Sequence, residues 1–219
     1  MTDVDLESAL PVFGTVPDAI IDAIAERGWY VGEEVLPASL MLALREDAQA
    51  RRAAFDAAGT GRGLNHDIRR RLRTDAIQWL DGSSEAQRAW LEGCEALRLA
   101  FNRHLFMGLF NFECHYARYD SGDFYGKHVD AFRGERNRVL TVVTYLNPDW
   151  QPENAGELVI YRPDSDEELT RVLPRLGTLV VFLSEDYPHE VLPARQERLS
   201  IAGWYRINTS SSDRVDPAR

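Results

Sequence analysis

The chain has 219 residues, of which 44% are hydrophobic and 27% charged, so it can bury the core of one domain and is not globally disordered. Acidic residues outnumber basic ones by 35 to 25, and the net charge of −10 argues against nucleic acid or an anionic membrane as the main partner. Two cysteines, Cys94 and Cys114, are too few for a disulfide framework or a four-cysteine zinc site. The sequence also lacks an apolar run of the ~18–20 residues that cross a bilayer, and its acidic first residues do not form a signal peptide. We therefore expect a soluble, cytoplasmic protein.

Residues 1–105 show mainly helical periodicity, and we expect them to form a helical support region within the same domain. One helix is predicted over Pro17–Arg27, with proline at its first position and glycine after its end. A second, longer pattern covers Pro37–Ala58, and a third covers Glu85–Leu105 with a serine cap at position 83 or 84. Between the last two, the alternation at 75–79 indicates a short strand.

Residues 106–208 are typical of β structure instead. Apolar and β-branched runs are separated by turn signals such as Asn147-Pro148-Asp149 and Pro193-Ala194. The predicted strands are 110–116, 139–146, 157–161, 179–183, 189–193 and 199–205. Many short strands punctuated in this way predict a mainly β fold, a sandwich or double-sheet barrel with helices packed outside. The polar residues 209–219 are expected to form a flexible tail.

The candidate chemistry begins at His128-Val129-Asp130. In an extended strand, residues i and i+2 point to the same face about 6.6 Å apart, so one metal ion fits between their side chains. Alone this pair carries little weight, because 5 histidines and 35 acidic residues in 219 produce about one such pair by chance. The aromatic and glycine-containing residues 119–127 that precede it favour a turn that enters a pocket.

Two residues further along the chain complete a recognisable set. His189 opens a short strand and Arg198 opens the last one. If the turn lies at Pro193-Ala194, His189 and Arg198 become cross-strand neighbours in a hairpin. Two histidines and one carboxylate form the facial triad of non-haem Fe(II) oxygenases, and an arginine suits a carboxylate ligand. These are the parts that a 2-oxoglutarate-dependent oxygenase requires.

The order and spacing of these motifs resemble the catalytic domain of the prolyl 4-hydroxylases of the hypoxia-sensing type and their bacterial relatives. The matching stretches are Arg73-x-Asp75-x-Ile77-x-Trp79, His128-Val-Asp130, Tyr145-Leu-Asn-Pro-Asp-Trp150, Gly156-Glu-Leu158, Pro188-His189-Glu-Val191, and Arg198 through Trp204-Tyr205. The resemblance covers roughly residues 68–207. It implies a double-stranded β-helix, or jelly-roll, core with supporting helices.

The resemblance also implies roles for individual residues. His128, Asp130 and His189 would bind Fe(II), and Arg198 would pair with the far carboxylate of the co-substrate 2-oxoglutarate. Tyr145 would hydrogen-bond that same carboxylate, and Tyr119 would lie near the metal-chelating end of the co-substrate. The positions that match the substrate cleft of the family are Arg73, Trp79, Tyr125, Arg138 and Trp204.

The implied reaction is O2-dependent hydroxylation of a prolyl residue in a protein substrate, a translation protein being one candidate, with ascorbate as an optional reductant. Three departures concern the surroundings of the site: Ala155-Gly156 replaces a Gly-Gly pair of the family, the loop after Asp130 is one residue longer, and Ala202 stands where its animal members carry threonine. Alternatives are an oxygenase of small molecules, a nucleic-acid demethylase, a 2-oxoglutarate or oxygen sensor without turnover, and a metal-binding module of cupin type. The oligomeric state stays open.

Cys94, Cys114 and the histidines at 66, 104 and 115 have no metal-ligand spacing, and we interpret them as structural.

Overall fold

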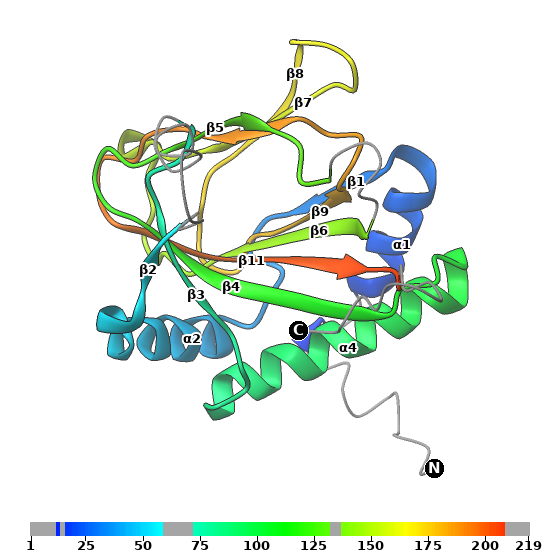
Figure 1. Cartoon of the computed structure of the whole chain (residues 1–219), viewed down its shortest axis with the longest axis horizontal. Helices are drawn as coiled ribbons and strands as arrows, with labels where there is room; N and C mark the ends of the chain where they lie inside the picture. The colour runs from blue at the N-terminus through cyan, green and yellow to red at the C-terminus, as the bar shows by residue number, and fades with distance from the viewer. Residues whose placement is uncertain (1–11, 14–15, 59–71, 132–136, 209–219) are drawn as a thin grey trace, which may run out of the picture.

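Two antiparallel sheets face each other in the computed structural model, which describes residues 12–13, 16–58, 72–131 and 137–208 (Figure 1). The predicted tail at 209–219 and His66 lie outside these residues. The larger sheet has the order β1-β9-β6-β11-β4-β3-β2 and the smaller one β5-β10-β7-β8. The strands are β1 Trp29–Gly32, β2 Asp56–Ala57, β3 Ala76–Trp79, β4 Asn111–Tyr119, β5 Tyr125–His128, β6 Arg138–Tyr145, β7 Leu158–Tyr161, β8 Glu168–Val172, β9 Leu179–Leu183, β10 His189–Val191 and β11 Arg198–Arg206.

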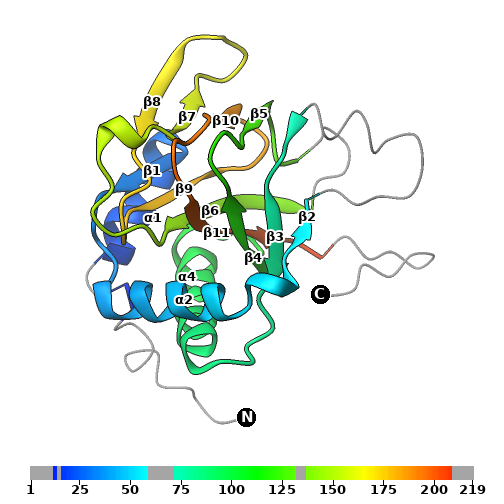
Figure 2. The ribbon, with the colours of Figure 1, turned by 90° about the vertical axis from the view of Figure 1, so that its left-hand side faces the viewer.

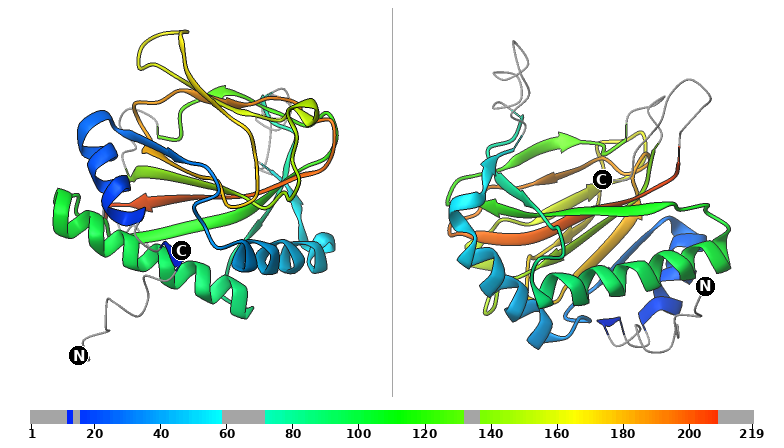
Figure 3. Two further views of the ribbon diagram at one scale, coloured as in Figure 1. Left: turned by 180° about the vertical axis from the view of Figure 1, so that it is seen from behind. Right: turned by 60° about the horizontal axis from the view of Figure 1, so that its bottom comes forward.

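Three helices cover the outer face of the larger sheet: α1 Val16–Arg27, α2 Ala38–Ala50 and α4 Glu85–Leu105. Figures 2 and 3 show them together on the side that faces away from the smaller sheet. Their apolar side chains and the helix-facing residues of the larger sheet form one core, which includes Trp90, Leu97 and Phe101 of α4. A second core, between the sheets, contains Tyr145, Ile160 and Phe182. The mainly β architecture with flanking helices confirms the predicted fold class.

Most of the predicted elements are confirmed, and α4 matches its predicted bounds. Ser84 is its N-cap and accepts a hydrogen bond from the backbone of Gln87 at 3.2 Å. The short strand predicted at 75–79 is β3. The sequence pattern did not predict β1, β5 or β8, of which β1 adds to the larger sheet a strand from the N-terminal part of the chain.

The helix predicted over Pro37–Ala58 was wrong at its C-terminal end. It stops at Ala50, a 3-10 turn follows at Arg52–Ala54, and the chain then pairs as β2 with β3. Phe55 stacks on Tyr116 of β4, with 6.5 Å between the ring centroids. Tertiary contacts therefore override the helical preference of an alanine-rich sequence at this point.

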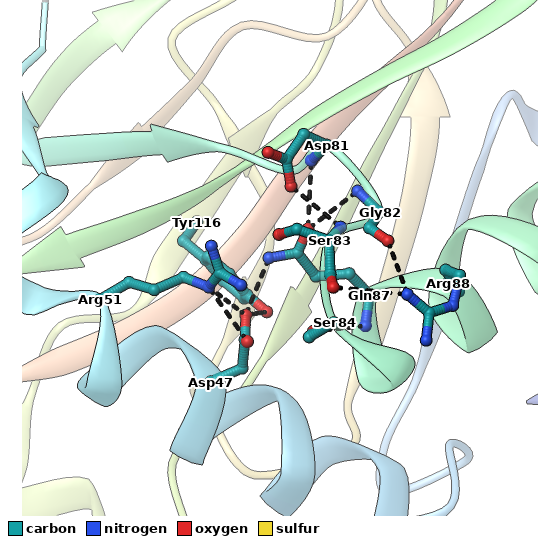
Figure 4. Close-up of polar contacts among 9 residues, drawn as sticks. All are labelled: Asp47, Arg51, Asp81, Gly82, Ser83, Ser84, Gln87, Arg88 and Tyr116. Carbon is teal, nitrogen blue, oxygen red and sulfur yellow. Dashed lines mark hydrogen bonds and ion pairs between the residues drawn. The ribbon is translucent and has the colours of Figure 1, made fainter.

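A polar network joins two helices to the larger sheet (Figure 4). The amide nitrogen of the fully buried Gln87 donates to Asp47 of α2 at 2.8 Å, and its amide oxygen accepts the backbone N–H groups of Asp81 and Gly82. The Tyr116 hydroxyl of β4 also donates to Asp47, at 3.0 Å. Burial would raise the pKa of Asp47, but the hydrogen bonds that it accepts outweigh this effect and hold its pKa below the ordinary value. The carboxylate of Asp47 is thus the point at which α2, α4 and β4 meet.

None of the helices in the described ranges combines the length and apolar character that a membrane crossing requires.

Gln87→Ala should lower the free energy of unfolding by about 2–4 kcal/mol, because it strands two backbone donors and removes one partner of Asp47. Urea denaturation followed by circular dichroism measures the change. Gln49→Ala is the matched control, since Gln49 is exposed on α2, and it should change stability by less than about 0.5 kcal/mol. Equal losses in the two variants would contradict a structural role for the network.

Candidate metal centre

A cavity opens between the two sheets. Of the eleven residues predicted for the site, ten line it, and the eleventh, Tyr145, contacts one of those ten. The ten are Arg73, Trp79, Tyr119, Tyr125, His128, Asp130, Arg138, His189, Arg198 and Trp204. They come from both sheets and from the segment before β3, so the fold gathers residues more than 120 positions apart.

Three possible metal ligands lie close together in the cavity. The ligand atoms of His128, Asp130 and His189 all lie within 4.8 Å of one another. The Nε2 atoms of His128 and His189 are each 3.5 Å from an oxygen of Asp130. Strands β5 and β10 pair so that the two histidines are direct cross-strand partners. In the described part of the chain, no other group of three or more histidine, cysteine, aspartate or glutamate side chains lies close enough to hold a metal ion.

Backbone carbonyls determine which histidine nitrogen faces the cluster. His128 Nδ1 lies 2.9 Å from the Gly126 carbonyl and His189 Nδ1 lies 3.0 Å from the Tyr187 carbonyl. A carbonyl only accepts, so each Nδ1 carries a proton and each Nε2 is the nitrogen that faces the cluster. Burial lowers the pKa of His189 to about 4, although the Asp130 carboxylate opposes this, so its ring is neutral at pH 7.

Asp130 is held across the gap between the sheets. It lies two residues beyond the end of β5, and its Oδ2 accepts a 2.8 Å hydrogen bond from Thr141 of β6. The Thr141 hydroxyl is in turn 2.9 Å from that of Ser184. Burial would raise the pKa of Asp130, but the two histidines outweigh it and hold the pKa well below the usual range. The cluster thus combines an ionised carboxylate with a neutral imidazole.

Arg198 lies in the same cavity and is 1% exposed. It donates from Nε to the Gly156 carbonyl at 2.9 Å and from a terminal nitrogen to Ser200 at 3.2 Å. The rings of Tyr119 and Tyr145 lie 4.9 and 5.0 Å from its Cζ. Within the described ranges, no carboxylate forms an ion pair with this buried cation. Burying an unpaired charge is costly, so the arrangement suits an anionic ligand.

The hydroxyl of Tyr145 is a second unsatisfied group beside Arg198. It is buried and has no hydrogen-bond partner among the described residues. Burial raises the pKa of Tyr145 to about 12 against the opposing effect of the Arg198 charge, so the hydroxyl keeps its proton and can donate it. An acceptor that enters next to Arg198 would satisfy both groups.

Two details of the predicted geometry were wrong. His189 and Arg198 are not cross-strand neighbours: His189 pairs with His128 and Ile160 in the smaller sheet, whereas Arg198 pairs with Tyr119 in the larger one. Residues 192–197 do not form a hairpin turn but carry the chain from one sheet to the other. Asp130 also lies outside β5, so the motif is not one extended strand. Arg198 and the two histidines therefore line the cavity from opposite sheets and are not neighbours within one sheet.

The alanine that replaces a glycine of the family pattern at position 155 has a strained backbone conformation. Ala155 adopts φ 54° and ψ −146°, a region that side chains other than glycine rarely occupy. Its carbonyl accepts the indole N–H of Trp150 at 2.9 Å, and the carbonyl of Gly156 binds Arg198. The strained turn therefore holds the buried arginine in place.

The residues predicted for the substrate cleft all line the cavity that holds the triad. Trp79 is 40% exposed, whereas Trp204 is buried and its indole nitrogen forms no hydrogen bond of normal geometry with any residue that the structure describes. The guanidinium of Arg138 stacks on Trp204 at 3.7 Å and is held by Glu113 at 2.8 Å.

Sequence reasoning missed His115 as a cavity residue. It is buried, and its ring lies 5.3 Å from that of Trp79 and 5.4 Å from that of Trp204. Burial lowers its pKa to about 4, and the charge of Arg73 acts in the same direction. Only its pairing opposite Trp79 in β3 would have identified it, and that pairing is not readable from spacing. Cys94 and Cys114 are buried, as expected.

Comparisons with known proteins agree with this geometry. The sequence model of the 2OG-Fe(II) oxygenase superfamily matches residues 114–206. The crystal structure of a Pseudomonas putida prolyl-4-hydroxylase superposes with a TM-score of 0.79 at 42% identity, covering 87% of this chain and 98% of that one. The chain belongs to the 2OG-Fe(II) oxygenase superfamily. The resemblance to prolyl hydroxylases that the sequence indicated is confirmed.

Two further relatives extend the likeness. Egl nine homolog 1 of Rattus norvegicus is 29% identical over 153 residues, which are 64% of this chain. The chain spans only 43% of the length of that relative. A Trichoplax adhaerens prolyl hydroxylase, solved with a peptide fragment of a hypoxia-inducible factor, shares the fold with a TM-score of 0.72 and 23% identity, and the alignment covers 94% of each chain.

The buried histidines predict how stability depends on pH. His115 and His189 have pKa values of about 4 in the folded protein, whereas histidines of an unfolded chain titrate near 6.5. Below pH 6.5 the unfolded chain therefore binds more protons, and the free energy of unfolding falls until pH 4, by up to about 3 kcal/mol for each histidine.

His115→Met should reduce this acid-dependent loss of unfolding free energy by the contribution of one histidine. Urea denaturation at pH 7, 6, 5 and 4.5 with a chelator present measures the change. His104→Gln is the control, because His104 is exposed, and its pH dependence should equal that of the wild type. An unchanged pH dependence in His115→Met would contradict the neutral, buried state of this ring.

Proposed function

We propose that the chain is an Fe(II)- and 2-oxoglutarate-dependent oxygenase that hydroxylates a prolyl residue of a protein substrate. The observation that carries the proposal is Arg198, a buried cation that faces the triad of His128, Asp130 and His189 and has no carboxylate partner among the described residues. The resemblance to the Pseudomonas putida prolyl-4-hydroxylase, which covers nearly the whole of that protein, supports proline as the target.

The donor set fits a divalent iron ion. His128 and His189 would each offer Nε2, and Asp130 would offer a carboxylate oxygen, the facial set of non-haem iron sites. Both histidines are oriented by backbone carbonyls, which is the usual support of metal-bound imidazoles. When bound, Fe(II) supplies the redox chemistry that couples oxidative decarboxylation of 2-oxoglutarate by O2 to oxidation of a C–H bond.

Arg198 and Tyr145 would hold the far carboxylate of 2-oxoglutarate. The guanidinium offers paired donors to the two oxygens of a carboxylate, and the tyrosine hydroxyl adds a third. This contact would satisfy both buried groups and leave the keto acid end of the co-substrate directed at the triad. Tyr119, whose ring also lies against Arg198, would flank the same ligand.

The substrate would lie against Trp79, Arg138 and Trp204. An open cleft with exposed and buried aromatic rings suits an extended segment that contains proline, whose ring packs against flat apolar surfaces. We retain a translation protein as the first target class to screen. A cytoplasmic location and the use of ascorbate remain predictions from the sequence.

The test combines turnover with a mass measurement. Purified protein with Fe(II), 2-oxoglutarate and O2 should form succinate in step with a 16 Da gain on a proline of a bacterial translation protein or of a peptide from a proline-peptide panel. Arg198→Met should raise the KM for 2-oxoglutarate about 100-fold, since charge-assisted hydrogen bonds contribute about 1.5–3 kcal/mol each.

Arg171→Met is the matched control, because Arg171 is partly exposed on β8 and pairs with Glu168. The KM of this variant for 2-oxoglutarate should equal that of the wild type. If the protein binds 2-oxoglutarate but forms no succinate in any of these mixtures, the result would favour the alternative of a 2-oxoglutarate or oxygen sensor without turnover. Hydroxylation or demethylation of nucleic acid in place of proline would refute the substrate part of the proposal.

A further inference from the structure

Three flat groups are stacked beside the triad. The Tyr125 ring lies parallel to that of His128, with 3.6 Å between the centroids and 12° between the planes. The guanidinium of Arg73 lies 4.3 Å from the centroid of the same tyrosine ring. At these distances the imidazole and the guanidinium cannot share one face, so Tyr125 is covered on both sides. A substrate can therefore reach only the edge and the hydroxyl of Tyr125. Substrate binding does not explain why both faces of the ring are covered.

The outer end of the stack is fixed to the protein. Asp75, which is 1% exposed, receives two hydrogen bonds from Arg73, of 2.7 and 2.6 Å. A β-bridge joins Arg73 to Tyr125, and Thr74 exchanges two hydrogen bonds of 3.1 Å with Phe124. The segment before β3 is therefore clamped to the start of β5, where Tyr125 is located.

The inner end of the stack is a side chain whose orientation matters. His128 can offer Nε2 to an ion only while Nδ1 faces the Gly126 carbonyl. His189 borders the ring as well, with 4.3 Å between centroids but an angle of 54°, so it provides no parallel surface. Tyr125 is the parallel surface that opposes rotation of the imidazole about its Cβ–Cγ bond.

We propose that Tyr125, held by the Arg73–Asp75 ion pair, is a positioning residue that orients His128 for metal binding. The inference rests on the proposed function, because that function makes His128 a metal ligand. Without the stack, His128 loses its preferred orientation and must be ordered when the ion binds. Groups that orient metal ligands typically contribute 10- to 100-fold to metal affinity.

The test is metal affinity in the absence of 2-oxoglutarate and substrate. Mn(II) and Co(II) are titrated into the metal-free protein by calorimetry, and the visible spectrum of bound Co(II) reports the ligand geometry. Tyr125→Leu should bind both ions about 10-fold more weakly and change the Co(II) spectrum, whereas Tyr125→Phe, which keeps the ring, should behave as the wild type. The pair Arg73→Gln with Asp75→Asn removes the cation without stranding a charge and should weaken binding about threefold.

Tyr161→Leu is the matched control. Tyr161 lies in the same sheet, but its ring contacts the Lys127 ammonium group rather than a triad residue, so the metal affinity of this variant should equal that of the wild type. Wild-type affinity and spectrum in Tyr125→Leu would overturn the inference and leave the proposed function intact. Absence of metal binding in the wild type would instead refute the proposed function. If Tyr125→Leu does not fold, unchanged affinity in the Arg73–Asp75 double variant would equally overturn the inference.

Discussion

The hydrogen bond from Thr141 to Asp130 connects the two sheets at the place where the chemistry is proposed. The histidines belong to the smaller sheet, and Arg198 belongs to the larger one. The cavity exists only because the sheets pack face to face, and the carboxylate of Asp130 is the triad member fixed from the opposite sheet. Because Thr141 and Ser184 leave Asp130 little freedom, we expect the cluster to be largely formed before any ion arrives.

The larger sheet gives this arrangement its rigidity. Strand β11 pairs along nearly its whole length with β4 on one side and β6 on the other, which places Arg198 beside Tyr119 and brings Tyr145 within reach of it. The helices support the same sheet from behind through the apolar core and through Asp47. Burying an arginine that has no ion-pair partner among the described residues lowers stability, and a rigid, well-packed sheet can tolerate that loss.

Much of this could be read from the sequence, because its patterns are local. Helical periodicity and a serine cap located α4, and alternating or β-branched runs located most strands of the larger sheet. Non-local pairing was not predictable: the chain between His189 and Arg198 looks like a hairpin and instead crosses between sheets. His115 was taken as structural because its place opposite Trp79 depends on strand register, and the early end of α2 depends on the packing of Phe55. The candidate site residues were chosen through motif order, which reflects a family pattern rather than local geometry.

The most direct measurement is an anaerobic titration of the Fe(II)-loaded chain with 2-oxoglutarate, followed by visible absorption. If the triad holds iron and Arg198 anchors the co-substrate, a weak charge-transfer band should grow to saturation at one equivalent and be absent from His189→Ala. A wild-type sample that demonstrably contains iron but shows no band at saturating 2-oxoglutarate would contradict the account.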